Sequence, residues 1–175
     1  MKKFELTNEF ITNMFGTKLF RIRALVEFGD VEAGELGGYV EKESNLGHDD
    51  NAWVYDNAWV YGNARVYGDA QVSGNAWVYG NAWVYGDARV CGNGDYAYAH
   101  GFGSVNRTTT FFRLKDGGVG VRCGCFYGTL AQFRDKIRET HGETKKAQEY
   151  LMLADLMELR FEEDENEVGN RKYVE

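Results

Sequence analysis

Small apolar residues recur every six positions through the middle of the chain. The phrase Asn/Asp-Ala-x-Val-x-(Gly/Asp/Ser) repeats without a gap over residues 51–90, and its valines are Val54, Val60, Val66, Val72, Val78, Val84 and Val90. Residues six apart do not share a face of an α-helix, which turns every 3.6 residues or so. A short fixed period instead indicates units that bury their apolar side chains by stacking, and a hexapeptide period is typical of parallel β-helices.

A second period of eighteen residues lies inside the first. The residue before each alanine reads Asn, Asn, Asp and then repeats, at Asn57, Asn63, Asp69, Asn75, Asn81 and Asp87. Three hexads therefore form one coil with three short sides. Valine and alanine lie inside, and glycine beside Asn or Asp forms the corners, because these residues tolerate a positive φ. Tyr96 and Phe102 continue the phase, which predicts about three coils and a β-helix over residues 51–106.

Residues 1–50 are predicted to form an N-terminal β cap and the coil that leads into the repeat. Two β-rich segments, KFELTNEF and KLFRIRALVEF, flank a turn at residues 13–17. Val40 and Leu46 are then six apart, but Val54 follows after eight, so the register slips by two around His48. This stretch is either an imperfect first coil or a capping loop. A short solenoid needs such caps because its ends expose strand edges and apolar core.

Residues 107–163 are predicted to form a ββαα appendage. Two β-rich segments, 108–114 and 119–126, flank a Lys-Asp-Gly-Gly turn. Thr129 begins a capping-box pattern, and the helix that follows ends at Gly142. A second helix is expected over residues 144–161. Residues 164–175 are expected to be an acidic, disordered tail. The fold class is therefore mainly β, with a β-helix body between two caps.

Composition narrows the functional classes. The 175 residues hold 43% hydrophobic side chains and no apolar run of membrane-spanning length, and the first residues lack a signal-peptide core. Cys91, Cys123 and Cys125 form no obvious disulfide set, which favours a reduced, cytoplasmic setting. The net charge of −7 argues against non-specific binding to nucleic acid. We expect neither membrane association nor a metal, because the Cys-x-Cys pair lacks a matched second pair.

The repeat resembles hexapeptide-repeat proteins of the left-handed parallel β-helix class, which includes trimeric acyltransferases. VYGNARVYGDAQV carries that resemblance. Most of the chain also resembles a group of proteins common in phages and prophages of Gram-positive bacteria. These share segments like GDVEAGELGGYVEKESNL, NAWVYGNA, FGSVNRTTTFF, VRCGCFYGTLAQF and ETHGETKKAQEYL. The left-handedness of the coil and the homotrimer are what these resemblances imply, since general sheet physics favours right-handed crossovers.

An enzymatic function has few candidate residues. Hexapeptide acyltransferases use a histidine as general base, and this chain offers His48, His100 and His141. His48 lies in the register slip and His141 at a helix end, so both are expected to be structural. His100 follows the repeat. No loop interrupts residues 54–90 to hold an acyl carrier, so no catalytic residue and no cofactor is predicted, and acyl transfer is the alternative function.

The outer face of the coil carries many aromatic residues. A coil of eighteen stacks Trp59 on Trp77 and Tyr61 on Tyr79, and the next side places Arg65 under Trp83. So much apolar surface must be covered. It forms either a contact between copies of the chain or a stacking surface for a planar ligand. The residues of this predicted stacking or oligomer face are Trp59, Tyr61, Trp77, Tyr79, Trp83 and Tyr85.

A polar cluster lies at the junction of coil and appendage. Arginine offers a planar fork of N–H donors and threonine a neutral hydroxyl, which together suit a phosphate or a carboxylate. The predicted ligand-binding residues are Arg107, Thr108, Thr109, Thr110, Arg113, Arg122 and His100. A β-rich strand whose threonines merely alternate is the simpler interpretation.

These observations lead to a functional hypothesis. We expect a non-enzymatic binding protein, a homotrimer in the cytoplasm of a bacterial host. The resemblance to phage proteins implies a counter-defence role, in which the protein sequesters a small phosphate-bearing, nucleotide-like signal or blocks a host defence protein. A hexapeptide-type acyltransferase is the alternative, and a structural trimer without a ligand is the third possibility.

Overall fold

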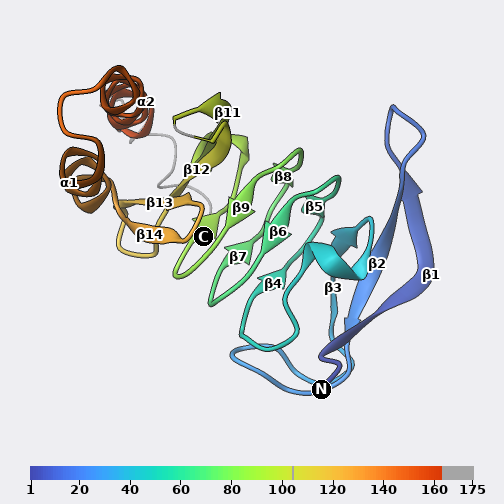
Figure 1. Ribbon diagram of the computed structural model, residues 1–175. Helices are drawn as coiled ribbons and strands as arrows, with labels where there is room; N and C mark the ends of the chain where they lie inside the picture. Colours follow the sequence, from blue (N-terminus) through green and yellow to red (C-terminus); the bar gives the residue numbers. More distant parts are fainter. Residues whose placement is uncertain (104, 163–175) are drawn as a thin grey trace.

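The computed structural model describes residues 1–103 and 105–162 (Figure 1). The predicted acidic tail at residues 164–175 lies outside this part of the chain. The described residues form a mainly β protein in which a stack of coils lies between an N-terminal hairpin and a C-terminal part with two helices (Figure 1). The mainly β class is thereby confirmed.

The repeat forms a solenoid of two-residue strands. These are β4 (Trp53–Val54), β5 (Trp59–Val60), β6 (Arg65–Val66), β7 (Gln71–Val72), β8 (Trp77–Val78), β9 (Trp83–Val84) and β10 (Arg89–Val90). They pair in parallel with the strand eighteen residues away, as β4–β7–β10, β5–β8 and β6–β9. Every repeat valine and its alanine are fully buried. Gly68, with φ 73°, lies so close to Gly86 that a Cβ would come within 2.8 Å of the Gly86 nitrogen.

The N-terminal segment continues the stack by one irregular coil. The strands β1 (Phe4–Thr12) and β2 (Lys18–Ala24) form the predicted hairpin, and β3 (Leu36–Val40) pairs with β2 on one side and with β5 on the other. Tyr39 faces Trp59, and Leu46 bridges Val66, each twenty residues away. The two-residue slip is thus absorbed between residues 46 and 53, near the short helix η1 (Glu43–Asn45). The imperfect first coil is the correct alternative.

Side chains replace the missing coil at the N-terminal end of the stack. The Lys3 ammonium donates to the carbonyl of Ala52 at 2.8 Å, and the Asn45 amide donates to that of Ala64 at 2.8 Å. His48 accepts from the Lys3 N–H at 3.2 Å. These bonds satisfy backbone groups that the next coil would otherwise bond.

The coil ends earlier than predicted. After Val90 and the short helix η2 (Asn93–Asp95), β11 (Tyr96–Phe102) leaves the stack and pairs antiparallel with β12 (Arg107–Arg113). The expectation that Tyr96 and Phe102 continue the coil is therefore wrong, although Tyr96 is buried in the solenoid core. A seven-residue strand gains more ladder hydrogen bonds with β12 than two-residue coil edges offer.

The appendage is a four-stranded antiparallel sheet with two helices. Its strand order is β11, β12, β13 (Val119–Cys123) and β14 (Phe126–Thr129), so the predicted strand 119–126 is split by a turn at Gly124, whose φ is 59°. The helices are α1 (Leu130–His141), with the predicted capping box at Thr129, and α2 (Lys145–Phe161). Within the described residues, no helix combines the length and the hydropathy that a bilayer crossing requires.

This sheet closes the second end of the solenoid. Successive side chains of β12 point to opposite faces of the sheet, so Phe112 lies in the solenoid core and Phe111 in the core beneath the helices. The Thr110 hydroxyl accepts from the Trp83 N–H at 2.9 Å, and the Asn93 side chain accepts from the Trp77 N–H at 2.7 Å. In a longer solenoid, carbonyls of a further coil would accept from these two N–H groups. The side chains of Thr110 and Asn93 accept instead, and they fix the sheet against the last coil.

Candidate anion-binding site

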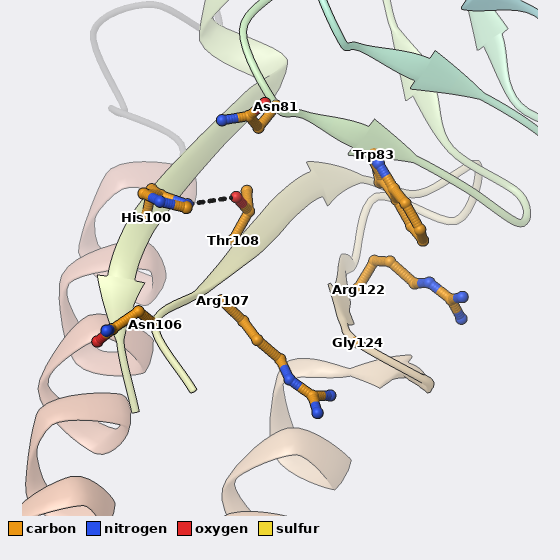
Figure 2. Close-up of a pocket in the computed structure, with 8 residues that line it drawn as sticks. All are labelled: Asn81, Trp83, His100, Asn106, Arg107, Thr108, Arg122 and Gly124. Carbon is orange, nitrogen blue, oxygen red and sulfur yellow. Dashed lines mark hydrogen bonds between the residues drawn. The ribbon is translucent and has the colours of Figure 1, made fainter. Parts of the chain in front are cut away.

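A cavity of about 360 Å³ opens where the last coil meets the appendage sheet (Figure 2). We call it the central cavity. Its residues come from the coil, from β11, from the start of β12 and from the end of β13, and they are Asn81, Trp83, His100, Asn106, Arg107, Thr108, Arg122 and Gly124. Figure 2 shows Trp83 and Arg122 on one side of the cavity and His100 with Thr108 on the other.

Strand register brings the polar residues together. Thr108 on β12 faces His100 on β11, and two residues further Thr110 faces Arg122 on β13. Residues two apart on a strand share a face, so these side chains lie on the solenoid side of the sheet. The His100 Nδ1 and the Thr108 Oγ1 are 2.8 Å apart and form a hydrogen bond. His100, Thr108 and Arg122 are thus brought into one site from three strands.

Arg122 is held by aromatic rings. Its guanidinium carbon lies 5.5 Å from the Trp83 ring centroid and 5.0 Å from that of Tyr85. Its Nε is buried and has no hydrogen-bond partner within residues 1–103 and 105–162. Arg65 on the coil before contacts the same Trp83 ring at 5.3 Å. A buried N–H donor without a partner is costly, so a ligand oxygen there would relieve that cost.

Arg107 separates the central cavity from a second one. Its side chain passes Gly124 so closely that a Cβ at this glycine would collide with the guanidinium. The second, helix-side cavity has a volume of about 230 Å³ and is lined by Arg107, Cys123, Cys125, Phe126, Phe133, Lys136, Ile137, Thr140, His141 and Tyr150. Burial raises the pKa of Tyr150 to about 12, and the neighbouring Cys123 adds to this shift. The tyrosine therefore stays a neutral phenol at physiological pH.

No sequence pattern indicates the helix-side cavity. Phe133 and Ile137 are spaced as the apolar face of a helix, and they are buried on that face of α1. The space beside Arg107 depends on how α1 and α2 pack on the sheet. This packing is seen in the structure and not in the sequence pattern.

A third cavity adjoins the central cavity on the coil. This coil-side cavity has a volume of about 320 Å³ and is lined by Lys42, Ser44, Asn63, Ala64, Arg65, Asn81 and Trp83. Asn81 and Trp83 also line the central cavity, so the two cavities adjoin at these residues. Of residues 1–103 and 105–162, no aspartate or glutamate lines the central, helix-side or coil-side cavity.

Three of the predicted ligand-binding residues lie outside the central cavity. Thr109 and Thr110 are buried, and Thr110 bonds the Trp83 N–H while the Thr109 hydroxyl donates to the Cys123 Sγ at 3.2 Å. Arg113 packs on the ring of Phe161 and pairs with Asp95 at 3.5 Å. These contacts hold the appendage to the coil and to α2, so the three side chains serve packing.

The predicted aromatic face divides into two parts. Trp59 and Trp77 stack at 4.7 Å and Tyr61 and Tyr79 at 5.4 Å, in the predicted eighteen-residue ladder. Trp77 and Tyr79 are 40% and 43% exposed. The residues of the next side, Trp83 and Tyr85, instead contact Arg122 and the appendage. The guanidinium groups of Arg65 and Arg122 already lie over the Trp83 ring. The ring therefore holds these two cations in place and is not free to stack on a planar ligand.

The remaining histidines and the cysteines occupy other surroundings. The His48 ring stacks on Phe4 at 4.3 Å, and His141 lies against Tyr150 at the end of α1. All three cysteines are free thiols. In residues 1–103 and 105–162 no three His, Cys, Asp or Glu side chains are grouped as metal ligands would be.

Comparison with known proteins supports the interpretation of the repeat as a β-solenoid. Residues 58–71 and 70–86 match the family described as YdcK beta solenoid repeat. The chain is similar to that family over these two stretches, which lie within β5 to β9 and the adjoining turns. A search of the curated proteins gave no match.

Proposed function

We propose that the protein binds a small phosphate-bearing, nucleotide-like ligand and does not transform it. The ligand's phosphate lies in the central cavity and its ring in the helix-side cavity. The observation that carries this proposal is the position of Arg107 between a polar, cationic cavity and an aromatic one. A nucleotide has the same two halves, joined at one point.

The central cavity suits a phosphate. Arg107 and Arg122 form no salt bridge within the described residues, so their N–H donors are available to an anion. Thr108 adds a hydroxyl and His100 a ring nitrogen. Arginine forks match phosphate oxygens in pairs, and charge-assisted hydrogen bonds are about twice as strong as neutral ones.

The helix-side cavity suits a planar ring. Phe126, Phe133, Ile137 and Tyr150 line it, and Tyr150 keeps its hydroxyl proton because burial raises its pKa. Aromatic side chains stack on nucleobases with little regard to sequence, which contributes about 1–3 kcal/mol per base. A ligand with an apolar ring and an anionic group therefore fits both cavities better than a free inorganic anion does.

The biological role follows from the resemblance to phage proteins. A protein that binds a nucleotide-like signal tightly and leaves it intact lowers its free concentration, so we propose a counter-defence function by sequestration. The solenoid is proposed to be left-handed and to assemble as a homotrimer in the bacterial cytoplasm. The exposed rings of Trp77 and Tyr79 support a protein contact, either with another copy of the chain or with a host defence protein.

Acyl transfer remains the alternative. His100 lines the central cavity and could serve as a base, but its ring contacts a threonine hydroxyl, and no bond to a carboxylate orients it within the described residues. A structural trimer without a ligand is the third possibility. Turnover of acetyl-CoA with a range of acceptors, abolished in His100→Gln, would establish the enzyme.

The proposal is tested by what the purified protein carries. Native mass spectrometry, followed by denaturation and measurement of the released mass and absorbance, should find a phosphate-bearing compound that absorbs in the ultraviolet. Arg107→Gln should be purified empty, because the residue lies between both cavities. Arg138→Gln is the control, since Arg138 is exposed on α1 and its side chain pairs, among the described residues, with Asp135 one turn away. Equal loading of Arg107→Gln and the wild type would contradict the proposed site.

A further inference from the structure

A ligand with one phosphate and one ring would occupy the central and helix-side cavities and leave the coil-side cavity empty. This cavity adjoins the central cavity at Asn81 and Trp83, which line both. Its own cations come from two earlier coils, with Lys42 on the irregular first coil and Arg65 on β6. The solenoid and the appendage therefore form two adjoining cavities, which we together call the groove.

In the part of the chain that the structure describes, every Asp, Glu, Lys or Arg that lines this groove is basic. Lys42 and Arg65 in the coil-side cavity, and Arg107 and Arg122 in the central cavity, make no salt bridge within residues 1–103 and 105–162. The chain carries 27 acidic against 20 basic residues, so carboxylates are common elsewhere on it. A groove that gathers unpaired cations on an acidic protein indicates an anionic occupant.

Trp83 sets the spacing of the two cationic positions. Arg65 approaches its ring at 5.3 Å from the preceding coil, and Arg122 approaches at 5.5 Å from the appendage. A guanidinium that stacks on a ring keeps its N–H edge free for oxygen acceptors. One tryptophan thus holds two such edges, one for each cavity, before any ligand arrives. Pre-ordered donors reduce the entropy that binding would otherwise cost.

We infer that the ligand carries two separated phosphate groups, one bound by Arg122 and Arg107 and the other by Arg65 and Lys42. This inference rests on the proposed function and specifies its ligand class. A 5′-phosphorylated dinucleotide has this chemistry, because a nucleoside lies between its two phosphates. A nucleoside monophosphate fills the central and helix-side cavities and leaves the coil-side cavity empty.

Isothermal titration calorimetry with three compounds tests the inference. The compounds are adenosine 5′-monophosphate, the 5′-phosphorylated adenine dinucleotide and inorganic triphosphate. The variant is Arg65→Gln, a change that the fold accepts because Gln71 holds the same repeat position on the next side of the coil. The control is Arg89→Gln, also at this repeat position, whose side chain bonds the carbonyl of Asp69 outside the groove.

The wild type should bind the dinucleotide at least about tenfold more tightly than the monophosphate, because a charge-assisted hydrogen bond changes affinity by that order. Arg65→Gln should remove that difference and leave the affinity for the monophosphate unchanged, and Arg89→Gln should change neither. Triphosphate that binds as tightly as the dinucleotide, with the same loss in Arg65→Gln, would support the two-phosphate site and assign it to a polyphosphate.

Two results would overturn the inference. If the dinucleotide and the monophosphate bind equally, or if Arg65→Gln binds both as the wild type does, the coil-side cavity holds no phosphate. The proposed function would then still stand, provided that Arg107→Gln weakens the monophosphate. If no compound binds the wild type and Arg107→Gln changes nothing, both proposals fail together.

Discussion

Two threonines on one strand separate the stability of the fold from ligand binding. Thr110 and Thr108 lie two residues apart on the same face of β12. Thr110 is 1% exposed and its hydroxyl accepts from the Trp83 N–H at 2.9 Å, whereas Thr108 lines the central cavity and bonds His100. Replacing either with valine removes one hydroxyl and keeps the branched shape.

Thr110→Val should destabilise the protein by about 1–2 kcal/mol. The N–H that loses its partner belongs to the last coil, where no further coil offers a carbonyl, and an orphaned buried donor costs about 1–3 kcal/mol. We take the lower half of that range because Trp83 is only partly buried. In a protein of this length the change lowers the melting temperature by roughly 2–8 °C. Thr108→Val should stay within about 0.5 kcal/mol of the wild type, because its hydroxyl is partly exposed.

Urea unfolding followed by tryptophan fluorescence measures both variants. Calorimetric titration with adenosine 5′-monophosphate then gives the opposite order, with weaker binding for Thr108→Val and near-normal binding for Thr110→Val. If Thr110→Val is as stable as the wild type, the hydroxyl does not replace a coil carbonyl and the capping argument is wrong. If Thr108→Val loses as much stability as Thr110→Val, the pair does not separate the two roles.

Three further predictions concern other parts of the molecule. Lys3→Met leaves the buried carbonyl of Ala52 and the partly buried carbonyl of Asp50 without the Lys3 donor and should cost about 1–3 kcal/mol in urea unfolding, and an unchanged midpoint would contradict this role. Because burial raises the pKa of Tyr150 to about 12, its contribution to stability is present below pH 10 and lost as the pH rises toward 12. Urea midpoints measured over that range should fall less steeply in Tyr150→Phe. Trp77→Ser should convert a trimer to monomers in sedimentation velocity if its exposed ring lies in the contact, and an intact trimer would place that contact elsewhere.

The repeat could be predicted closely because its physics is local. Each valine and alanine faces inward by strand alternation and a fixed corner, so a period of eighteen is sufficient to place Trp59 over Trp77 and Arg65 beneath Trp83. The two-residue slip near His48 was also visible, and the structure absorbs it as a twenty-residue coil. The helix caps followed from the pattern at Thr129.

The prediction from the sequence was wrong where segments that are distant in the sequence pair or pack with one another. The six-residue phase through Tyr96 and Phe102 could not show that β12 would pair with this strand and remove it from the coil. Trp53 holds an outward repeat position, yet it is fully buried because Phe4 and Phe28 of the N-terminal segment cover it. Long-range pairing and packing decide both cases, and neither leaves a mark in the local pattern.

The candidate site was predicted in part. The cluster at the junction contained Arg107, Thr108, Arg122 and His100, which the structure brings near one cavity. Which threonines would face the solvent depended on the register of β12, and a shift of one residue exchanges the two faces. The contribution of Asn81 depended on where the coil stops.

Capping by side chains makes the number of coils an adjustable property of this architecture. Lys3 and Asn45 bond alanine carbonyls, and Thr110 bonds the N–H of a residue that follows an alanine, so each cap uses a backbone group that recurs in every hexad. A whole eighteen-residue unit could therefore be gained or lost by recombination between similar repeats without exposing a strand edge. Each unit would move the N-terminal cap by about 4.8 Å relative to the appendage. Each unit corresponds to 54 nucleotides of the gene. Gaining or losing one unit would change the distance between Lys42 and the arginines of the appendage by about 4.8 Å.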